Sequence, residues 1–406
     1  MMIRQAIILC GGLGTRLGDL TQAKPKPMLS VNGRPFLELL IGEVARQGFD
    51  DIVLLAGFCA HEIILFVDKN PFIAQLRATV RVVVEPEPAG TGGALHFAAP
   101  YLASEFIMMN GDSLFDIPLR KLCRQLAEHS NLGGVMALRE IDSPDRYGLV
   151  ELAGGIVERF AERKPGLASG LINGGIYAIR RDVMLPHVGS KCSMEADVFP
   201  AMADKRMLGG LVCGGFFIDI GVPESFAEAQ TAIPSLLRRP AVFFDRDGVL
   251  NKNHGYVGSV DRFEWIEGAL EAVVAANEAG YLVFIVTNQA GIARGFYGEP
   301  DVISVFDHMQ QTLADQGGHI DDFRYCPHHP DGSVAGYRKS CGWRKPGPGM
   351  ILDLIDQWMV DASKSFLIGD YPSDVEAANA AGIDGYLYCG GRLDAMMHPL
   401  IRARQG

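Results

Sequence analysis

The sequence predicts an α/β protein with two doubly wound, mostly parallel-sheet domains. Short apolar runs, typical of buried strands, alternate along the chain with segments that carry apolar residues at helical spacing. This alternation occurs in two series, separated by a short segment with prolines at Ile233–Pro240. The length of 406 residues also favours two cores over one. We therefore expect one domain over residues 1–236 and a second over residues 237–406.

The elements of the first series follow from its apolar runs. Buried strands are predicted at Ala6–Leu9, Ile52–Ala56, Val80–Val84 and Phe106–Met109. Helices are predicted over residues 35–47 and 118–129, each with a proline in its first turn. The second series predicts strands at Ala241–Phe244, Leu282–Val286 and Phe366–Ile368, and helices at Ala269–Glu278 and Val302–Asp315.

Composition excludes several classes of protein. No apolar run approaches the ~18 residues of a membrane helix. A net charge of −11 argues against nonspecific nucleic-acid binding, which needs a basic surface. Eight scattered cysteines are typical of reduced thiols, so we expect a cytoplasmic protein. Small phosphorylated substrates remain compatible with this charge. The chain could also form a homo-oligomer.

A glycine-rich loop follows the first predicted strand, in the sequence from Leu9 to Leu17. Gly11, Gly12 and Gly14 let the backbone of this loop, with Thr15, approach a triphosphate and point N–H groups at it. Arg16 and Lys26 would add positive charge as pyrophosphate leaves. Alone, such a loop is weak evidence for a nucleotide site.

Later motifs strengthen this interpretation. The segment from Glu87 to Gly93, with Gly90 and Thr91, can shape a base pocket. Asp112 and Asp219 each follow a predicted strand, and Mg²⁺ is usually held by one or two carboxylates together with substrate phosphates.

In this order the motifs resemble the sugar-1-phosphate nucleotidyltransferases over about residues 3–232, and among them the heptose 1-phosphate guanylyltransferases. The resemblance implies that the loop from Leu9 binds GTP, that Lys26 contacts its phosphates, and that Asp112 and Asp219 hold Mg²⁺. It places the sugar phosphate against Tyr147, Gly148, Glu162, Arg163, Lys164, Asn173 and Gly174. The reaction implied is in-line attack of a sugar-phosphate oxygen on the α-phosphorus.

The second half opens with a pair of carboxylates, Asp245 and Asp247, directly after a predicted strand. Their spacing turns both side chains to one side of the sheet edge, where one can attack phosphorus and the other can protonate the leaving alkoxide. Thr287 and Asn288 can hold phosphate oxygens, and Lys345 offers a cation. Asp370 follows another strand and suits Mg²⁺, with Asp374 in support.

This set resembles the haloacid-dehalogenase (HAD) phosphatases across residues 241–390, and its finer motifs match the heptose 1,7-bisphosphate 7-phosphatases. The resemblance implies that Asp245 is the nucleophile and Asp247 the acid and base. Mg²⁺ would bind Asp245, Asp370 and the backbone carbonyl of Asp247. The substrate would face Arg294, Arg344 and Lys345. Histidinol phosphatases share much of this set, and Tyr371 stands where the family often has a basic residue.

A zinc site is doubtful. The family's structural site uses Cys-x-His and then Cys-x-Cys, and this chain has Cys326, His328 and Cys341, but Trp343 at the last position. Structural zinc is almost always four-coordinate, so we expect a phosphatase domain that works with Mg²⁺ alone, with Trp343 packing over the loop in the metal's place. His329 or water as the fourth ligand is the alternative.

Together the two resemblances imply consecutive steps of GDP-heptose synthesis. Heptose 1,7-bisphosphate would lose its 7-phosphate, and GTP would then transfer GMP to the heptose 1-phosphate. One alternative is a mannose-1-phosphate guanylyltransferase fused to a broader sugar or histidinol phosphatase. Another is a binding protein that senses nucleotide sugars without turnover. Such a protein should have lost catalytic or metal-binding aspartates, but this chain keeps all five: Asp112, Asp219, Asp245, Asp247 and Asp370.

Overall fold

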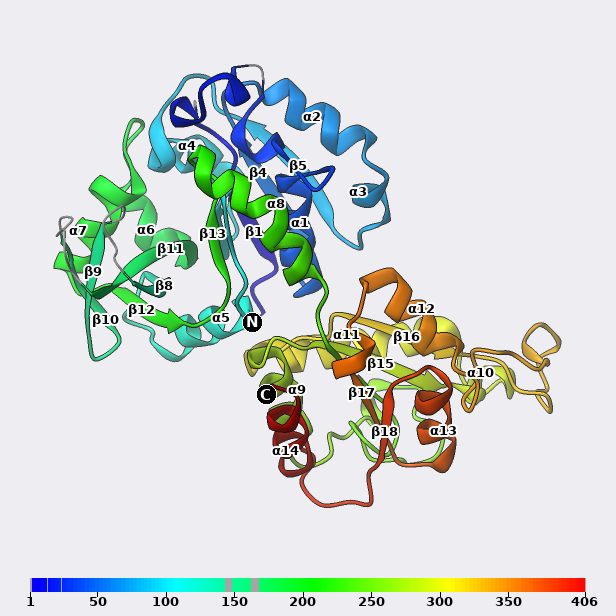
Figure 1. The fold of residues 1–406 in the computed structure, drawn as a ribbon. Coiled ribbons are helices and arrows are strands. Elements are labelled where there is room, and N and C mark those ends of the chain that lie inside the picture. Colours follow the sequence, from blue (N-terminus) through cyan, green and yellow to red (C-terminus); the bar gives the residue numbers. More distant parts are fainter. Residues whose placement is uncertain (1, 13, 23, 143–147, 162–167, 406) are drawn as a thin grey trace. The chain divides into compact units, whose positions relative to one another are not determined.

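The computed structural model describes residues 2–12, 14–22, 24–142, 148–161 and 168–405 (Figure 1). Within these residues the chain divides into two compact units, Met1–Ser235 and Leu236–Gly406. Each unit has its own sheet with helices packed against it, and the α/β class predicted for both halves is confirmed.

The described part of the first unit contains a nine-stranded sheet in the order β5-β4-β1-β6-β11-β8-β12-β10-β9. Its first half is parallel and consists of β5 (Thr79–Val84), β4 (Asp51–Ala56), β1 (Gln5–Leu9) and β6 (Glu105–Asn110). These are the four strands predicted from the apolar runs. Because parallel strands end at the same edge of the sheet, the loops after β1, β4, β5 and β6 are brought together.

The second half of this sheet is mixed. It consists of β11 (Ser169–Arg180), β8 (Gly134–Asp142), β12 (Leu208–Cys213), β10 (Ile156–Ala161) and β9 (Leu149–Ala153). The long strand β11 is antiparallel to both β6 and β8, so the parallel order stops at β6. Two small sheets pair β7 (Ser113–Phe115) with β13 (Phe217–Asp219) and β2 (Ser30–Val31) with β3 (Arg34–Pro35).

The helices of the first unit include the two predicted ones. The α-helices of this unit are α1 (Phe36–Arg46), α2 (Ala60–Lys69), α3 (Pro71–Gln75), α4 (Gly90–Ala98), α5 (Leu119–Glu128), α6 (Arg181–Met184), α7 (Phe199–Asp204) and α8 (Pro223–Leu237). The start of the expected linker, Ile233–Leu237, belongs to α8 despite Pro234. Ile233 is buried, and this packing holds the last turn in a helix.

The second unit is a parallel sheet of five strands among the described residues, in the order β16-β15-β14-β17-β18. The strands are β14 (Ala241–Phe244), β15 (Leu282–Asn288), β16 (Asp322–Cys326), β17 (Phe366–Gly369) and β18 (Asp384–Leu387). The helices are α9 (Ala269–Glu278), α10 (Ala290–Ala293), α11 (Glu299–Asp315), α12 (Gly349–Trp358), α13 (Pro372–Ala380) and α14 (Leu393–Gln405).

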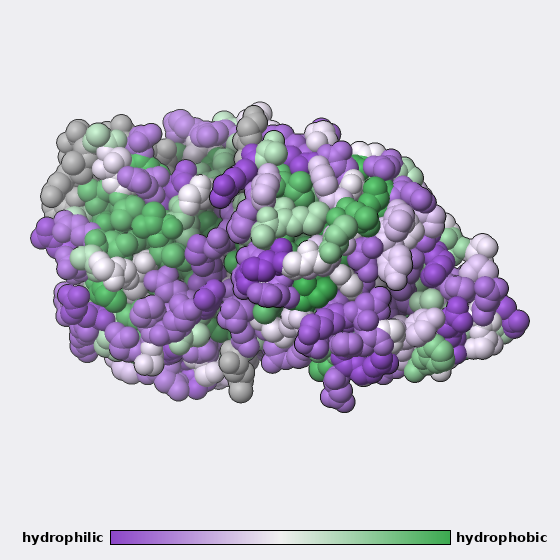
Figure 2. Space-filling view, turned by 90° about the horizontal axis from the view of Figure 1, so that it is seen from below, coloured by the Kyte–Doolittle hydropathy of each residue, from purple (hydrophilic) through white to green (hydrophobic). Residues whose placement is uncertain are grey.

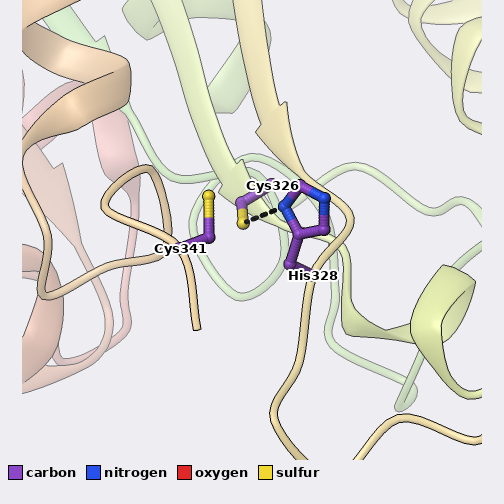
Figure 3. A group of neighbouring side chains, drawn as sticks. All are labelled: Cys326, His328 and Cys341. Carbon is purple, nitrogen blue, oxygen red and sulfur yellow. Dashed lines mark hydrogen bonds between the residues drawn. The ribbon is translucent and has the colours of Figure 1, made fainter. Parts of the chain in front are cut away.

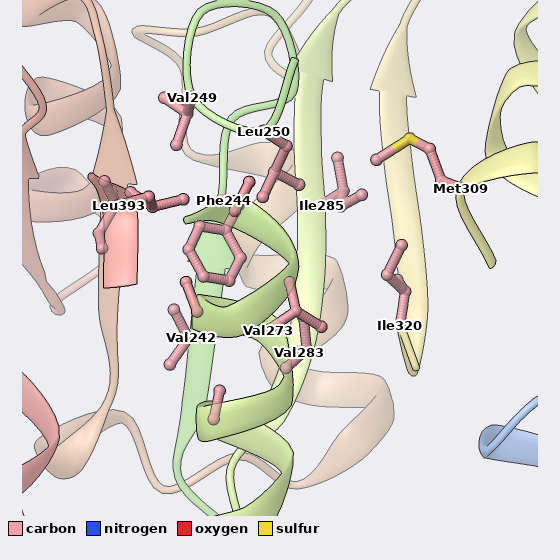
Figure 4. Close-up of a cluster of buried hydrophobic side chains, with 14 of the residues drawn as sticks. Val242, Phe244, Val249, Leu250, Val273, Val283, Ile285, Met309, Ile320 and Leu393 are labelled. Carbon is pink, nitrogen blue, oxygen red and sulfur yellow. The ribbon is translucent and has the colours of Figure 1, made fainter. Parts of the chain in front are cut away.

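Alternation along β14 explains how this sheet is covered on both faces. Val242 and Phe244 pack with Val273 of α9 in one hydrophobic cluster (Figure 4). Phe243, one residue apart, belongs to a second cluster that includes Leu354 of α12. Complete burial of such a side chain stabilises the fold by roughly 1.5–3 kcal/mol. The two clusters fix β14, and therefore the residues that follow it.

Exposed hydrophobic side chains occur in both units, for example Val212 and Phe296. The face shown in Figure 2 has such apolar groups interspersed with hydrophilic ones. None of the helices in the described ranges is long and apolar enough to span a bilayer.

Candidate active sites

The glycine loop after β1 uses two backbone conformations that favour glycine. Gly12 has a φ of 108° and Gly14 a φ of 62°, both in the left-handed region. Gly14 precedes a 3₁₀ turn, Thr15–Thr21, and its carbonyl accepts hydrogen bonds from the Leu17 N–H and the Thr21 hydroxyl. Leu13 and the side chain of Thr15 lie outside the described residues. The loop therefore has a fixed turn at Gly14, beside the end of β1.

The two aspartates predicted to hold a metal lie side by side. The N–H of Gly111 donates to the carbonyl of Leu9, which brings the end of β6 against the glycine loop. Ser113 pairs with Asp219 in the β7–β13 ladder, and the Ile220 N–H donates to the Asp112 carbonyl at 2.9 Å. The structure thus joins carboxylates that are more than 100 positions apart in the sequence.

Two cations face these carboxylates. Lys26 Nζ lies 2.9 Å from Asp112 Oδ2. A Cβ atom at Gly221 would lie 2.7 Å from Asp219 Oδ1 and 3.5 Å from Arg16 Nη2, so Arg16 approaches Asp219 across this glycine. Burial and the neighbouring Asp112 carboxylate raise the pKa of Asp219, and Lys26 and Arg16 oppose this. Two neighbouring carboxylates, of which Asp219 has a raised pKa, fit a divalent cation.

Glu85 is a site residue that the sequence analysis missed. It follows β5, and its N–H donates to the carbonyl of Ala56 at the end of β4. A Cβ atom at Gly57 would lie 1.9 Å from Glu85 Oε1, and one at Gly11 would lie 3.1 Å from it. The carboxylate therefore extends over Gly57 to the glycine loop. Burial raises its pKa, and a hydrogen bond from the Ala89 backbone opposes this shift.

The residues predicted for the base pocket make contacts within the protein. Glu87 is 57% exposed in its side chain, and its carboxylate pairs with Lys191. The Thr91 hydroxyl donates to Glu195 Oε2 at 2.8 Å and accepts from the Met194 N–H, so it is used within the fold. A Cβ atom at Gly90 would lie 2.5 Å from the Cys192 carbonyl oxygen, so this glycine permits close backbone packing.

Part of the predicted sugar site is described. The ladder between β11 and β8 is interrupted between Asn173 and Tyr177, and a Cβ atom at Gly175 would lie 3.0 Å from Asn110 Nδ2. Asn173 and Gly174 therefore lie beside the end of β6, which leads to Asp112. Gly148 directly precedes β9, and a Cβ atom there would lie 3.9 Å from the carbonyl oxygen of Ala161 at the end of β10. The remaining predicted sugar residues fall outside the described ranges: Tyr147, Glu162, Arg163 and Lys164.

The second unit gathers three carboxylates at the carboxyl ends of β14 and β17. They are Asp245, Asp370 and Asp374, and each places one carboxylate oxygen within 4.8 Å of a carboxylate oxygen of the other two. Lys345 Nζ lies 2.8 Å from Asp245 Oδ1 and 2.7 Å from Asp374 Oδ1. Gly248, at a φ of 98°, makes room, since a Cβ atom there would lie 2.1 Å from Asp370 Oδ2.

The electrostatics of this cluster fit a divalent cation. Burial raises the pKa of Asp245 to about 6, although the ammonium of Lys345 opposes the shift. Burial and the charges of Asp245 and Asp374 raise the pKa of Asp370 to about 7. Burial lowers the pKa of Lys345, but the two carboxylates outweigh it and the net shift is upward. Asp370 Oδ1 is buried without a hydrogen-bond partner, as expected of a metal ligand.

The carboxylate of Asp247 lies outside this acidic cluster. It receives hydrogen bonds from the side chains of Arg246, Asn251 and Gln289. The carboxylate of Asp247 is therefore not one of the clustered metal-ligand candidates.

The other predicted phosphatase residues have distinct surroundings. Thr287 is buried at the end of β15. Both side-chain amide atoms of Asn288 bond the backbone of Lys345, so this residue positions the lysine. The guanidinium of Arg294 lies 5.8 Å from the ring centre of Tyr256, and Arg344 donates to the His328 carbonyl. Tyr371 is 57% exposed, and its N–H donates to Asp374 Oδ2.

The three candidate zinc ligands come together (Figure 3). Cys326, His328 and Cys341 place ligand atoms within 4.8 Å of one another, and Cys326 Sγ lies 3.8 Å from His328 Nδ1. Burial raises the pKa of Cys326 to about 11. Trp343 is 37% exposed and lies against Gly349. In the described ranges no fourth His, Cys, Asp or Glu joins this group, so the residues do not complete a structural zinc site.

Two family models match the chain. Residues 5–235 match the nucleotidyl transferase family, and residues 342–402 match the HAD hydrolase-like family. The chain is 51% identical over 164 residues to the D-glycero-beta-D-manno-heptose-1,7-bisphosphate 7-phosphatase of Rhodopseudomonas palustris, covering 40% of this chain and 91% of that one. Identity to the protein of the same name from Escherichia coli K12 is 43%, over 36% of this chain and 75% of the relative.

Solved structures match the first unit. HddC from Yersinia pseudotuberculosis, also solved as a complex with GMP-PN, is 31% identical with a TM-score of 0.51. The match covers 57% of this chain and all of HddC. With the geometry of the two sites, these similarities show that the chain belongs to the nucleotidyl transferase family through its first unit and to the HAD-like phosphatases through its second.

Proposed function

We propose that this chain is a bifunctional enzyme of GDP-heptose synthesis. Residues 237–406 remove the 7-phosphate of D-glycero-D-manno-heptose 1,7-bisphosphate, and residues 1–236 transfer GMP from GTP to the resulting heptose 1-phosphate. The observation that carries this proposal is that each unit brings together carboxylates and a lysine of the kind that one of two consecutive reactions needs. The names of the phosphatase relatives and the HddC complex with GMP-PN support the substrates.

The phosphatase reaction proceeds in two steps. An oxygen of Asp245 attacks the phosphorus of the 7-phosphate, the bond from phosphorus to the C7 oxygen breaks, and that oxygen takes a proton from Asp247. Water then attacks the phosphorus of the aspartyl phosphate and gives a proton to Asp247, the bond from phosphorus to the Asp245 oxygen breaks, and phosphate leaves with the Asp245 carboxylate regenerated. Lys345 holds Asp245 in place throughout, at 2.8 Å.

We propose Mg²⁺ as the metal of both units. In the second unit Asp245 and Asp370 would hold it with the Asp247 carbonyl. The carboxylate of Asp374, which also pairs with Lys345, adds negative charge to this cluster. When bound, Mg²⁺ supplies positive charge for the phosphate oxygens. In the first unit Asp112 and Asp219 would hold it.

Nucleotidyl transfer in the first unit rests on positioning and charge. An oxygen of the sugar phosphate attacks the α-phosphorus of GTP, and the bond to pyrophosphate breaks. Lys26 and Arg16 lie where they can stabilise the charge on the departing pyrophosphate. The backbone of Gly11, Gly12 and Gly14 surrounds the phosphates.

Guanine selection is assigned to Glu85. Its carboxylate reaches over Gly57 to Gly11, and two carboxylate oxygens match the N1–H and exocyclic amine of guanine. Adenine would place a ring acceptor against the same carboxylate. Glu87, paired with Lys191 at the surface, is less suited to this role.

Incubation with heptose 1,7-bisphosphate of either anomer, Mg²⁺ and one nucleoside triphosphate at a time tests the proposal, with products identified by mass. We expect GDP-heptose from GTP and little product from ATP, CTP or UTP. Turnover of mannose 1-phosphate alone would instead favour the mannose enzyme.

All eight cysteines are free thiols, which supports a cytoplasmic setting.

A further inference from the structure

The side chain of Asp247 is held by three donors that come from two parts of the chain. Arg246 Nη2 donates to Oδ1 at 2.9 Å and to Oδ2 at 2.8 Å, and Asn251 Nδ2 donates to Oδ1 at 3.0 Å. Gln289 Nε2 donates to Oδ2 at 2.9 Å. Arg246 and Asn251 lie within four residues of Asp247 in the sequence, whereas Gln289 follows β15. Gln289 therefore ties the carboxylate to a neighbouring strand of the sheet.

The orientation of the Gln289 amide is fixed by its other partners. Its Oε1 accepts from the Tyr297 hydroxyl at 2.7 Å and from Arg246 Nη2 at 3.3 Å. A guanidinium can only donate, so the oxygen of the amide must face Arg246. The nitrogen must then face Asp247 and Thr287, whose Oγ1 it reaches at 2.9 Å.

This orientation has a consequence for Thr287. Because Oγ1 of Thr287 accepts a hydrogen bond from Gln289, its own O–H is left to donate to a phosphate oxygen. One buried amide thus contacts both the carboxylate that moves the proton and the hydroxyl expected to hold the phosphate. Gln289 is 1% exposed, which keeps both hydrogen bonds away from competing water.

Tyr297 is in turn held tightly. Cβ atoms at Gly258 and Gly291 would lie 2.1 and 2.3 Å from its ring, so both positions leave space for the tyrosine. Burial raises the pKa of Tyr297 to about 12, and its hydroxyl therefore remains a donor at neutral pH.

We propose that Gln289 is a positioning residue of the phosphatase: through Asp247 it sets the orientation in which the proton reaches the leaving oxygen. This inference rests on the proposed phosphatase activity. Gln289 does not touch the reacting atoms. Its loss should matter most for substrates whose leaving group needs a proton.

Comparison of two substrates tests this inference. The alkoxide released from heptose 1,7-bisphosphate needs a proton, whereas the acetate released from acetyl phosphate does not. In Gln289→Met we expect kcat on the heptose bisphosphate to fall on the order of 10- to 100-fold, less than the roughly 10²- to 10⁴-fold of a full acid–base contribution, because Asp247 itself remains. The loss on acetyl phosphate should be smaller by about tenfold or more, since it reflects only Thr287 and the phosphate site.

Two further variants serve as a graded test and a matched control. Tyr297→Phe removes the hydroxyl that orients Gln289 and should show the same substrate pattern with a smaller loss. Tyr325→Phe removes a hydroxyl that bonds Glu299 instead of Asp247 or Gln289, and it should leave the activity on both substrates unchanged. GMP transfer by the first unit should be unchanged in all three variants, and a melting transition of the second unit like that of the wild type shows that each variant is folded.

Equal losses on the two substrates in Gln289→Met would overturn the inference and leave Gln289 a structural residue. Absence of wild-type activity on heptose 1,7-bisphosphate would reject the proposed substrate instead. The same ratio measured with glycerol 2-phosphate, another alkyl phosphate, would then decide the role of Gln289.

Discussion

The ammonium of Lys345 lies 2.8 Å from Oδ1 of Asp245, the carboxylate that attacks phosphorus in our mechanism. Lys345 is 4% exposed and also reaches Asp374, so one buried cation faces two carboxylates while Asp370 adds a third. Without metal this cluster carries excess negative charge. The first of the predictions below follows from this charge.

The first prediction concerns stability. Burial raises the pKa of Asp370 to about 7 and that of Asp245 to about 6 in the folded protein. Carboxyl groups with a raised pKa favour folding below their unfolded pKa near 3.9, and this stability is lost as pH rises through the folded pKa. Asp370→Asn should therefore raise the melting temperature of the metal-free second unit by about 2–4 °C at about pH 7.5.

The effect should shrink at about pH 4.5, where Asp370 stays protonated in the folded protein and the pH is only slightly above the unfolded pKa near 3.9. Scanning calorimetry with and without Mg²⁺ measures it, and Mg²⁺ should stabilise the wild type more than the variant. A variant that melts at or below the wild-type temperature at pH 7.5 would contradict the electrostatic account. Phosphatase activity should be lost in Asp370→Asn.

Base selection gives the second prediction. Glu85→Gln replaces one carboxylate oxygen by an amide NH2 group that cannot accept from guanine, so kcat/KM for GTP should fall roughly 10- to 100-fold, as for other unpaired polar groups. Glu87→Gln is the matched control, and its effect should stay below about twofold, since exposed ion pairs contribute little. The reverse pattern would return the base site to Glu87.

Zinc is the subject of the third prediction. With three ligands in place and Trp343 at the fourth position, purified protein should contain no tightly held zinc and should work with Mg²⁺ alone. Trp343→Cys restores the family's fourth ligand and should take up zinc, which shows that the assay detects it. Metal analysis that finds about one zinc per wild-type chain would overturn this prediction.

Much of the fold was predictable because apolar runs mark buried strands directly. Both predicted series of strands are found, and the helices of residues 35–47 and 269–278 fall where periodicity placed them. Periodicity carries no information on strand direction, so the antiparallel insertion of β11 between β6 and β8 was missed. Pro234 suggested a linker, but burial of Ile233 extends α8 through it.

Residues that act through strand pairing were the hardest to predict. Glu85 follows β5 and reaches Gly11, which follows β1, by passing over Gly57 at the end of β4, the strand between them. A glutamate at a strand end, beside the glycine that follows the neighbouring strand, was the available signal. Gln289 likewise meets Asp247 because β15 pairs with β14. Sequence motifs identify such residues by type, and the sheet order determines what they contact.

The most direct test of the central claim, that one chain catalyses two consecutive steps, uses two inactivating substitutions in the whole protein. With heptose 1,7-bisphosphate, GTP and Mg²⁺, Asp245→Asn should give no GDP-heptose until heptose 1-phosphate is supplied, because its nucleophile is lost. Asp112→Asn should release phosphate but accumulate heptose 1-phosphate. A mixture of the two variants should restore GDP-heptose, identified by mass. Loss of both activities in either folded variant, or no GDP-heptose from the wild type, would contradict the account.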